Sequence, residues 1–285
     1  MEANRASATA SWVAMGRALV DGRQSLPGFS DSFAAKLLPD DCRRAVDSLL
    51  SHRRPRDLRE IRLRLIATFM EKLLGPRTVE IDRGLREMPA GVQVVLMGAG
   101  LDARAYRLQD LRDSIVFEVD HPASQAFKRK QVEGLKPCAR ELRYVPVDFT
   151  RQQVAVELEA AGHSTSLPTA WVFEGVISYL SPSEVEASIA AMASRSAPGS
   201  RLLATYNHPR GGFRRLADSF LARTGEPQRA AFRPAEMREL LERHGFVVRS
   251  DRDGLERLRH MGVTPSFLDR VTKFHHVVMA DVAAT

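Results

Sequence analysis

One stretch of the chain, Val92–Leu108, most constrains the fold. It reads VQVVLMGAGLDARAYRL, an apolar run that ends in Gly98-Ala99-Gly100. The run does not alternate between apolar and polar residues, which predicts a strand buried on both faces, as in a parallel sheet. The two glycines allow a tight turn, and they let a ligand approach the backbone closely at the start of a helix.

A second apolar run, Ile115–Phe117, is followed by two carboxylates, Glu118 and Asp120. Asp120 lies about 20 residues after the glycine turn, a spacing that suits a carboxylate within reach of a ribose hydroxyl. The two acidic residues are two positions apart in a strand, so both point to the same face and either could bind the ribose. We therefore expect a nucleoside-containing ligand at this turn.

The chain from residue 91 onward alternates between strand and helix patterns. Alternation of this kind predicts an α/β fold of the Rossmann-like type, a mostly parallel sheet with helices on both faces and right-handed crossovers. The expected strands are Gln93–Met97, Ile115–Val119, Leu142–Val147, Ala170–Phe173, Arg201–Tyr206, Phe246–Arg249 and His275–Ala280. The expected helices between them are Ala123–Glu133, Arg151–Ala161, Pro182–Ser196 and Pro234–His244.

Residues 1–90 are predicted to form a helical extension that packs on the core, residues 91–285, in one compact domain. Its longest amphipathic pattern runs from about residue 57 to residue 74 and is expected to end at Gly75-Pro76. Residues 207–232 are rich in arginine and glycine and follow the fifth strand. Since ligands bind at the carboxyl ends of such strands, we expect a lid there.

Charge and composition restrict the partners and the compartment. The net charge is +7, and arginines cluster between Arg53 and Arg64. Asp57 and Glu60 lie among these arginines, and no aromatic residue does. This favours a solvated helix face over a nucleic-acid surface. Two cysteines form no disulfide framework, and no apolar run could span a bilayer. We expect a cytoplasmic protein without a membrane partner, and the helical extension leaves a homodimer open.

The glycine turn by itself fits a dinucleotide-binding fingerprint. Residues 98–103 read GAGLDA, with an acidic residue at the expected distance. A dehydrogenase normally carries this fingerprint near the start of its domain, whereas about 90 residues precede it here. An NAD-dependent oxidoreductase and a non-catalytic binding module remain alternatives.

A longer set of segments, in a fixed order, resembles one family. The segments TASWVAMGRA and SDSFAAKLLP near the start, then PRT at 76–78, GAGLDARAYRL, FEVDHP, FKRK, VPVDF, TAWVFEGVISYLSPSEV and APGSRL resemble the leucine carboxyl methyltransferase family. Within it, the bacterial polyketide carboxyl O-methyltransferase-like branch is the most similar. The likeness covers residues 9–206 approximately and fades beyond.

The resemblance implies a class I methyltransferase fold that binds S-adenosyl-L-methionine, with a seven-stranded sheet whose last strand is antiparallel. It implies that Arg77 binds the methionine carboxylate and that Glu174 lies by the amino group. Asp120 would hold the ribose hydroxyls. The remaining cofactor residues implied are Gly98, Ala99 and Gly100 against the methionine part and Asp148 and Phe149 at the adenine.

The acceptor side is less determined. Family members often carry Leu-Met before the Tyr-Leu pair, where this chain has Ile177-Ser178, and Ser178 could polarise the acceptor pocket. Tyr179 could line that pocket. Tyr206 and Asn207 stand at the end of the fifth strand, where ligands bind in such sheets. The candidates for contact with the acceptor are therefore Tyr179, Tyr206 and Asn207.

Methyl transfer from a sulfonium requires alignment of donor and acceptor and exclusion of water. A carboxylate is ionised at neutral pH and needs no base, whereas a phenol would need one. The shared segments contain no evident acid–base pair or metal-ligand cluster. We therefore expect methylation of a small-molecule carboxylate, such as a polyketide or other natural-product intermediate, with a hydroxyl acceptor as the alternative. Arg210, Arg214 and Arg215 in the expected lid could attract an acid.

Overall fold

A computed structural model describes residues 8–148, 152–209 and 228–282. Seven strands form one sheet in the order β3-β2-β1-β4-β5-β7-β6. The first five pair in parallel, whereas β7 runs antiparallel to both β5 and β6. The bounds are β1 Gln93–Met97, β2 Ile115–Asp120, β3 Glu141–Pro146, β4 Thr169–Phe173, β5 Arg201–Asn207, β6 Phe246–Arg252 and β7 His275–Val282.

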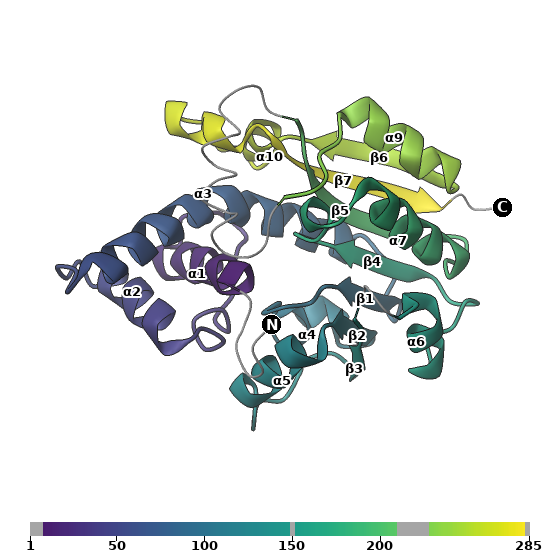
Figure 1. The fold of residues 1–285 in the computed structure, drawn as a ribbon, viewed down its shortest axis with the longest axis horizontal. Helices are drawn as coiled ribbons and strands as arrows, with labels where there is room; N and C mark the ends of the chain where they lie inside the picture. Colours follow the sequence, from purple (N-terminus) through teal and green to yellow (C-terminus); the bar gives the residue numbers. More distant parts are fainter. Residues whose placement is uncertain (1–7, 149–151, 210–227, 283–285) are drawn as a thin grey trace.

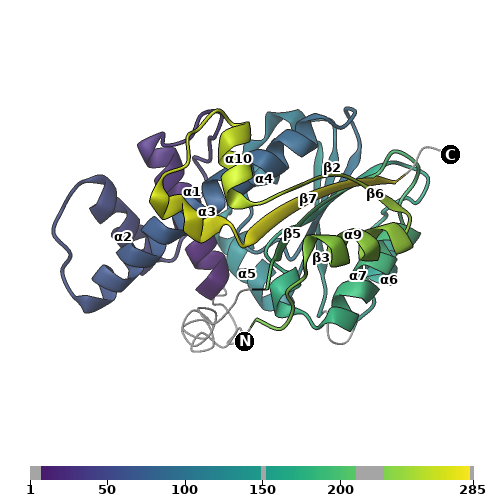
Figure 2. The ribbon, with the colours of Figure 1, turned by 90° about the horizontal axis from the view of Figure 1, so that it is seen from above.

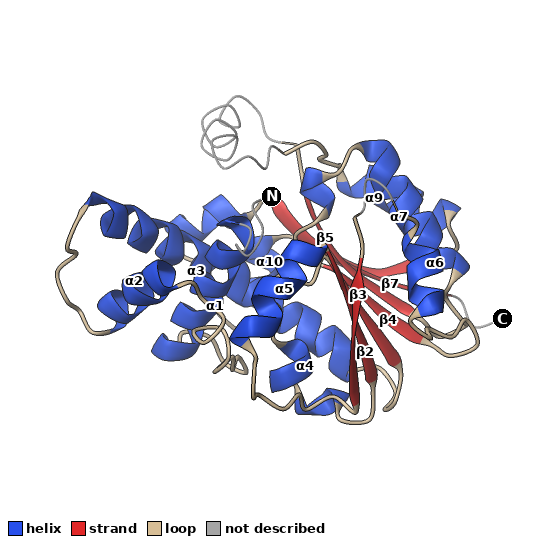
Figure 3. Cartoon of the chain, turned by 60° about the horizontal axis from the view of Figure 1, so that its bottom comes forward, coloured by secondary structure: helices blue, strands red, loops and turns tan. Residues whose placement is uncertain are grey.

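Helices cover both faces of the sheet (Figure 3). One face packs against α6 (Val154–Ala160), α7 (Pro182–Ser194) and α9 (Pro234–Arg243). The other packs against the first helices of the chain and α4 (Arg104–Arg107). The remaining elements are α1 Ala8–Arg23, α2 Asp40–Leu50, α3 Leu58–Arg86, α5 Pro122–Gln131, α10 Gly254–His260, η1 Gln109–Leu111, η2 Ile177–Tyr179 and η3 Phe267–Thr272. The expected α/β fold is confirmed.

The central strands are buried because their side chains alternate between two apolar cores. Val94 and Leu96 of β1 join the core under α1–α4, and Val95 and Met97 join the core under α6, α7 and α9. This explains why β1 reads as an uninterrupted apolar run. Since parallel strands end at the same edge of a sheet, the residues that follow β1, β2, β3 and β4 converge there.

The first helices form a group beyond one end of the sheet, with α2 farthest from it (Figures 1 and 2). The predicted boundary near residue 90 falls between α3 and β1. Most of the predicted lid, residues 210–227 with Arg210, Arg214 and Arg215, lies outside the described residues. None of the helices in the described ranges is both long and apolar enough to cross a membrane.

The expected end of a helix at Gly75-Pro76 is wrong. Helix α3 continues through both residues to Arg86. A β carbon on Gly75 would lie 2.5 Å from Leu26 Cδ1 and 2.9 Å from Val20 Cγ2. The glycine therefore reflects close packing against α1 and the segment after it, and the tertiary contacts offset the cost of proline inside the helix.

Helices α1 and α3 approach closely at Gly16. A β carbon there would lie 2.7 Å from the backbone carbon of Met70. Gly16→Ala should destabilise the protein by about 1–3 kcal/mol, because the backbone of α3 must move to accommodate the methyl group. Urea unfolding measures the loss.

Gly22→Ala is the matched control in the same helix. Its β carbon would meet only the end of the Leu50 side chain, at 2.6 Å from Cδ1, and a flexible side chain can move. A loss for Gly22→Ala equal to that for Gly16→Ala would contradict the close approach of the two backbones.

Candidate active site

Two adjoining cavities open at the carboxyl ends of the strands. The first, called here the strand-end cavity, has a volume of about 380 Å³. It brings together predicted site residues that are far apart in the sequence. Among its lining residues are Arg77, Gly98, Ala99, Gly100, Asp120, Asp148, Glu174, Gly175 and Tyr179. Phe149 lies outside the described residues.

The glycine turn forms one wall of the strand-end cavity. Gly98 and Gly100 have φ angles of +67° and +48°, in the left-handed region that favours glycine. A β carbon on Gly98 would lie 2.5 Å from Val176 Cγ2. The turn therefore needs glycine at residue 98 for both its conformation and its packing, and it keeps the backbone exposed to the cavity.

Asp120 lies opposite this turn and is joined to it. Its carboxylate accepts hydrogen bonds from the Gly100 N–H and from the His121 N–H, the latter at 2.6 Å. Burial raises the pKa of Asp120, while these two hydrogen bonds lower it. Glu118 is fully buried, pairs with Lys128 at 2.7 Å and lines neither cavity. Of the two carboxylates at the end of β2, only Asp120 is placed on the cavity.

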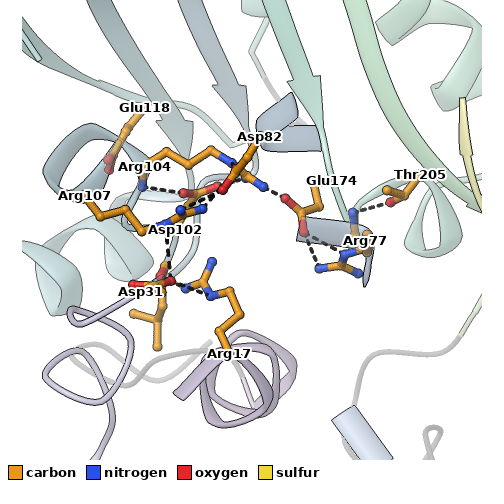
Figure 4. A network of polar contacts seen from close by, with 12 residues as sticks. Arg17, Asp31, Arg77, Asp82, Asp102, Arg104, Arg107, Glu118, Glu174 and Thr205 are labelled. Carbon is orange, nitrogen blue, oxygen red and sulfur yellow. Dashed lines mark hydrogen bonds and ion pairs between the residues drawn. The ribbon is translucent and has the colours of Figure 1, made fainter. Parts of the chain in front are cut away.

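Glu174, which follows β4, is held by two arginines (Figure 4). Its Oε1 accepts from Arg77 Nε at 2.6 Å, and its Oε2 accepts from Arg104 Nη1 at 2.6 Å. Burial raises the pKa of Glu174, but the charges of Arg104 and Arg77 outweigh burial and lower it to about 2. Glu174 is therefore a carboxylate at every physiological pH.

Arg104 connects this pair to a larger ion-pair network. It is fully buried and also contacts Asp82 at 2.7 Å and Asp102. Arg107 pairs with Asp82 and Asp31, and Arg17 pairs with Asp31 at 3.3 Å. Four arginines thus match four carboxylates, so the network is buried without a net charge.

The resemblance implies that Arg77 binds the carboxylate of the methionine part and that Glu174 lies by its amino group. The structure places both side chains on the strand-end cavity and also pairs them with one another. Asp148 lines the same cavity, and its backbone N–H donates to Gln152 Oε1 at 2.9 Å. These placements bring the described residues of the predicted cofactor set into one cavity.

The second cavity, called here the apolar cavity, has a volume of about 610 Å³. Its walls are mainly apolar side chains from α1 and the first half of α3. These include Trp12, Val13, Leu58, Ile61, Leu65, Ile66, Phe69, Met70, Leu73 and Leu74. Its polar lining is Thr9, Arg62, Arg77, Ser178, Tyr179, Thr205, Asn207, His208, Gln228 and His275. Five residues line both cavities, so the two meet there: Thr9, Val13, Arg77, Gly175 and Tyr179.

The three acceptor-side candidates are placed differently. Tyr179 lies at the junction of the cavities, and Asn207 lines the apolar cavity. Tyr206 lies on the opposite face of the sheet, where its hydroxyl donates to Asp251 and its ring stacks on His276 at 5.0 Å. Tyr206 is fully buried and lines neither cavity. Adjacent strand residues point to opposite faces, so only one of Tyr206 and Asn207 could reach the cavity.

Several residues of the apolar cavity could not be predicted from the sequence. His208 follows β5, His275 begins β7 and Thr205 stands two residues before Asn207. The register of β5 against β7 brings His275 opposite Asn207, and no local pattern reports that pairing. In the parts of the chain that the structure describes, no group of three or more His, Cys, Asp or Glu side chains is arranged to hold a metal ion.

Comparisons with known proteins agree on a family. The family model described as leucine carboxyl methyltransferase matches residues 10–193. A protein of Mycolicibacterium paratuberculosis, named as an inferred S-adenosyl-L-methionine-dependent methyltransferase, is 35% identical over 223 residues, which cover 73% of this chain and 68% of that protein. One from Mycolicibacterium gilvum, of the same name, is 42% identical over 128 residues, which cover 44% of this chain and only 41% of that protein.

Solved structures agree on the fold. A structure described as an inferred methyltransferase from Thermobifida fusca superposes with a TM-score of 0.57 at 17% identity, over 95% of this chain and 94% of that one. The magnesium protoporphyrin IX methyltransferase of Synechocystis, solved with bound SAH, has a TM-score of 0.50 at 14% identity and covers 75% of this chain and 87% of its own. At these identities the likeness shows the fold alone.

Loss of Arg104 should be costly, because three carboxylates would then stay buried with less neutralising charge. Arg104→Met should lower the free energy of unfolding by about 3–5 kcal/mol. Arg112→Met is the control, since Arg112 is 75% exposed and, among the described residues, pairs with its neighbour Asp113. Urea unfolding of both variants provides the comparison. Similar stability of the two variants would contradict a structural role for the buried network.

Proposed function

The chain belongs to the leucine carboxyl methyltransferase family, and from that premise we propose that it transfers the methyl group of S-adenosyl-L-methionine to a carboxylate oxygen of a small, largely apolar acid. One observation carries the proposal. The strand-end cavity, which the predicted cofactor residues line, adjoins the larger apolar cavity at Arg77, Gly175 and Tyr179. Donor and acceptor bound in these cavities would meet at that junction.

The strand-end cavity fits the cofactor chemically. Asp120 offers carboxylate oxygens to the hydroxyl donors of a ribose, and the glycine turn leaves its backbone open to the methionine part. Glu174 stays ionised beside the place where an ammonium group would lie, and Arg77 offers a guanidinium to a carboxylate. Bound there, S-adenosyl-L-methionine supplies an electrophilic methyl group on a sulfonium.

The charges around the apolar cavity support an acidic acceptor. Its lining among the described residues includes two arginines, Arg62 and Arg77, and neither an Asp nor a Glu. Arg77 is paired with Glu174, so the attraction for an anion comes from Arg62, whose guanidinium in an otherwise apolar wall also disfavours a cation. Because a carboxylate is ionised at neutral pH, the protein need only orient its oxygen toward the junction and exclude water.

Substitutions on the strand-end cavity test the cofactor assignment. Asp120→Asn and Arg77→Met should each weaken binding of S-adenosylhomocysteine at least about tenfold, because each removes a charge-assisted hydrogen bond. Calorimetry with the folded variants measures the change. Asp113→Asn, at an exposed site outside both cavities, should leave the affinity unchanged. Unaltered affinity in both cavity variants would contradict the proposed site.

The reaction itself is tested with methyl-labelled S-adenosyl-L-methionine and a panel of fatty, aromatic and polyketide-like acids. A methyl ester releases labelled methanol in mild alkali, whereas a methyl ether does not. We expect alkali-labile label in the product. Label that stays bound after alkali treatment would show methylation of a hydroxyl instead.

One observation favours a hydroxyl acceptor as a second candidate. His208 Nδ1 lies 2.8 Å from the Pro209 carbonyl oxygen, which can only accept, so Nδ1 carries a proton. A ring protonated on Nδ1 has its lone pair on Nε2, which can accept a proton, and His208 lines the apolar cavity. A phenol would need such a base.

The pH dependence of kcat/KM separates the two candidates. With a carboxylate acceptor, the rate should be nearly constant between about pH 6 and 9, and His208→Gln should change kcat only slightly. With a hydroxyl acceptor, the rate should rise with pH, because a protonated base cannot accept the hydroxyl proton, and His208→Gln should lower kcat about 100-fold or more. Steady-state rates over this range, in wild type and variant, decide the matter.

A further inference from the structure

We infer that Asn207 and His275 form a hydroxyl-binding subsite in the apolar cavity, so that the acceptor is a hydroxylated acid. This inference rests on the proposed function, because it describes a second polar group of the same acceptor. The cavity is otherwise lined mainly by apolar side chains, which leaves few polar contacts to fix the orientation of a ligand.

The two side chains are neighbours on one face of the sheet. Asn207, the last residue of β5, pairs directly with His275, the first residue of β7, in the antiparallel ladder. Directly opposite residues point to the same face, with β carbons about 5 Å apart. Both side chains line the apolar cavity, so one small group of a ligand can contact both.

Each side chain presents a buried polar atom without a partner. Asn207 is 7% exposed and His275 is 6% exposed. Within the described residues, Asn207 Oδ1 and His275 Nδ1 have no hydrogen-bond partner. Buried polar atoms in proteins are nearly always hydrogen-bonded, so two unpaired atoms in neighbouring residues that both line the cavity indicate a place for a ligand group.

The subsite lies close to the junction of the cavities. Asn207 Nδ2 donates to Ser178 Oγ at 3.0 Å, and Ser178 precedes Tyr179, which lines both cavities. Thr205, on the same face of β5, accepts from the Gly175 N–H at 2.8 Å. A group bound at Asn207 and His275 is therefore near the oxygen that receives the methyl group.

A hydroxyl satisfies this pair better than a carboxylate. Burial lowers the pKa of His275 well below its ordinary value, and the charges of Arg257 and Arg77 lower it further, so the ring is neutral. A neutral ring offers one donor and one acceptor, and Asn207 Oδ1 only accepts. A hydroxyl can donate to the amide oxygen and accept from the ring, and it also fits the reversed amide. A carboxylate only accepts.

The test compares two acids that differ in one hydroxyl, decanoate and 3-hydroxydecanoate. Calorimetry with the S-adenosylhomocysteine-bound protein measures both affinities without turnover. We expect the ratio of the dissociation constants, decanoate over 3-hydroxydecanoate, to fall about tenfold in Asn207→Leu and in His275→Leu. Circular dichroism spectra and melting temperatures show whether both variants are folded, and the ratio within each variant removes any effect common to the two acids.

Two further variants sharpen the result. His275→Gln keeps a donor and an acceptor and should retain more of the preference than His275→Leu. His244→Leu, at the end of α9 on the other face, should leave the ratio unchanged. A ratio that is the same in wild type, Asn207→Leu and His275→Leu would overturn the subsite while leaving the proposed function intact. Failure of the wild type to bind either acid would overturn the proposed function and the subsite together.

Discussion

The pairing of Glu174 with Arg77 and Arg104 is the interaction on which the site depends. An ionised carboxylate at the end of a buried strand would be prohibitively costly without opposite charges nearby. The two arginines come from different elements, Arg77 from α3 and Arg104 from α4, so the pairing also fixes those helices against β4. Through Asp82, Asp31 and Arg17, the same network reaches α1. The helices must therefore lie where their arginines can neutralise the buried carboxylates.

Helix α3 relates this network to both cavities. Its second half carries Arg77 and Asp82 into the ion-pair network, while its first half presents Leu58, Ile61, Leu65 and Phe69 to the apolar cavity. One continuous helix therefore connects the polar and apolar parts of the site. The buried Gly75-Pro76 step, which looks like a break in the sequence, lies between these two halves and packs against α1 and the residues after it.

Much of the strand-end cavity could be predicted from the sequence, since its residues follow buried strands of a parallel sheet. The turn at Gly98–Gly100, Asp120 and Glu174 each stand just after an apolar run, and such positions share one edge. Spacing alone left the choice between Glu118 and Asp120 open, because both point to the same face, and the resemblance favoured Asp120. In the structure Glu118 is buried against Lys128, whereas Asp120 lines the strand-end cavity. The direct pairing of Arg77 with Glu174 was also missed, since the two are 97 residues apart in the chain.

By itself the sequence determined the α/β fold and the edge of the sheet that carries the site, because periodicity and glycine spacing are local properties of the chain. The family followed from the resemblance of an ordered set of segments. Only the tertiary structure decided which residues face the acceptor. Adjacent residues of β5 point to opposite faces of the sheet, so Tyr206 points into the core and Asn207 points to the cavity. Which face carries the cavity is known only once the helices are placed on the sheet. The pairing of Asn207 with His275 depends on the register of two antiparallel strands separated by 67 residues. That register is set by packing across the whole sheet, which no local pattern encodes.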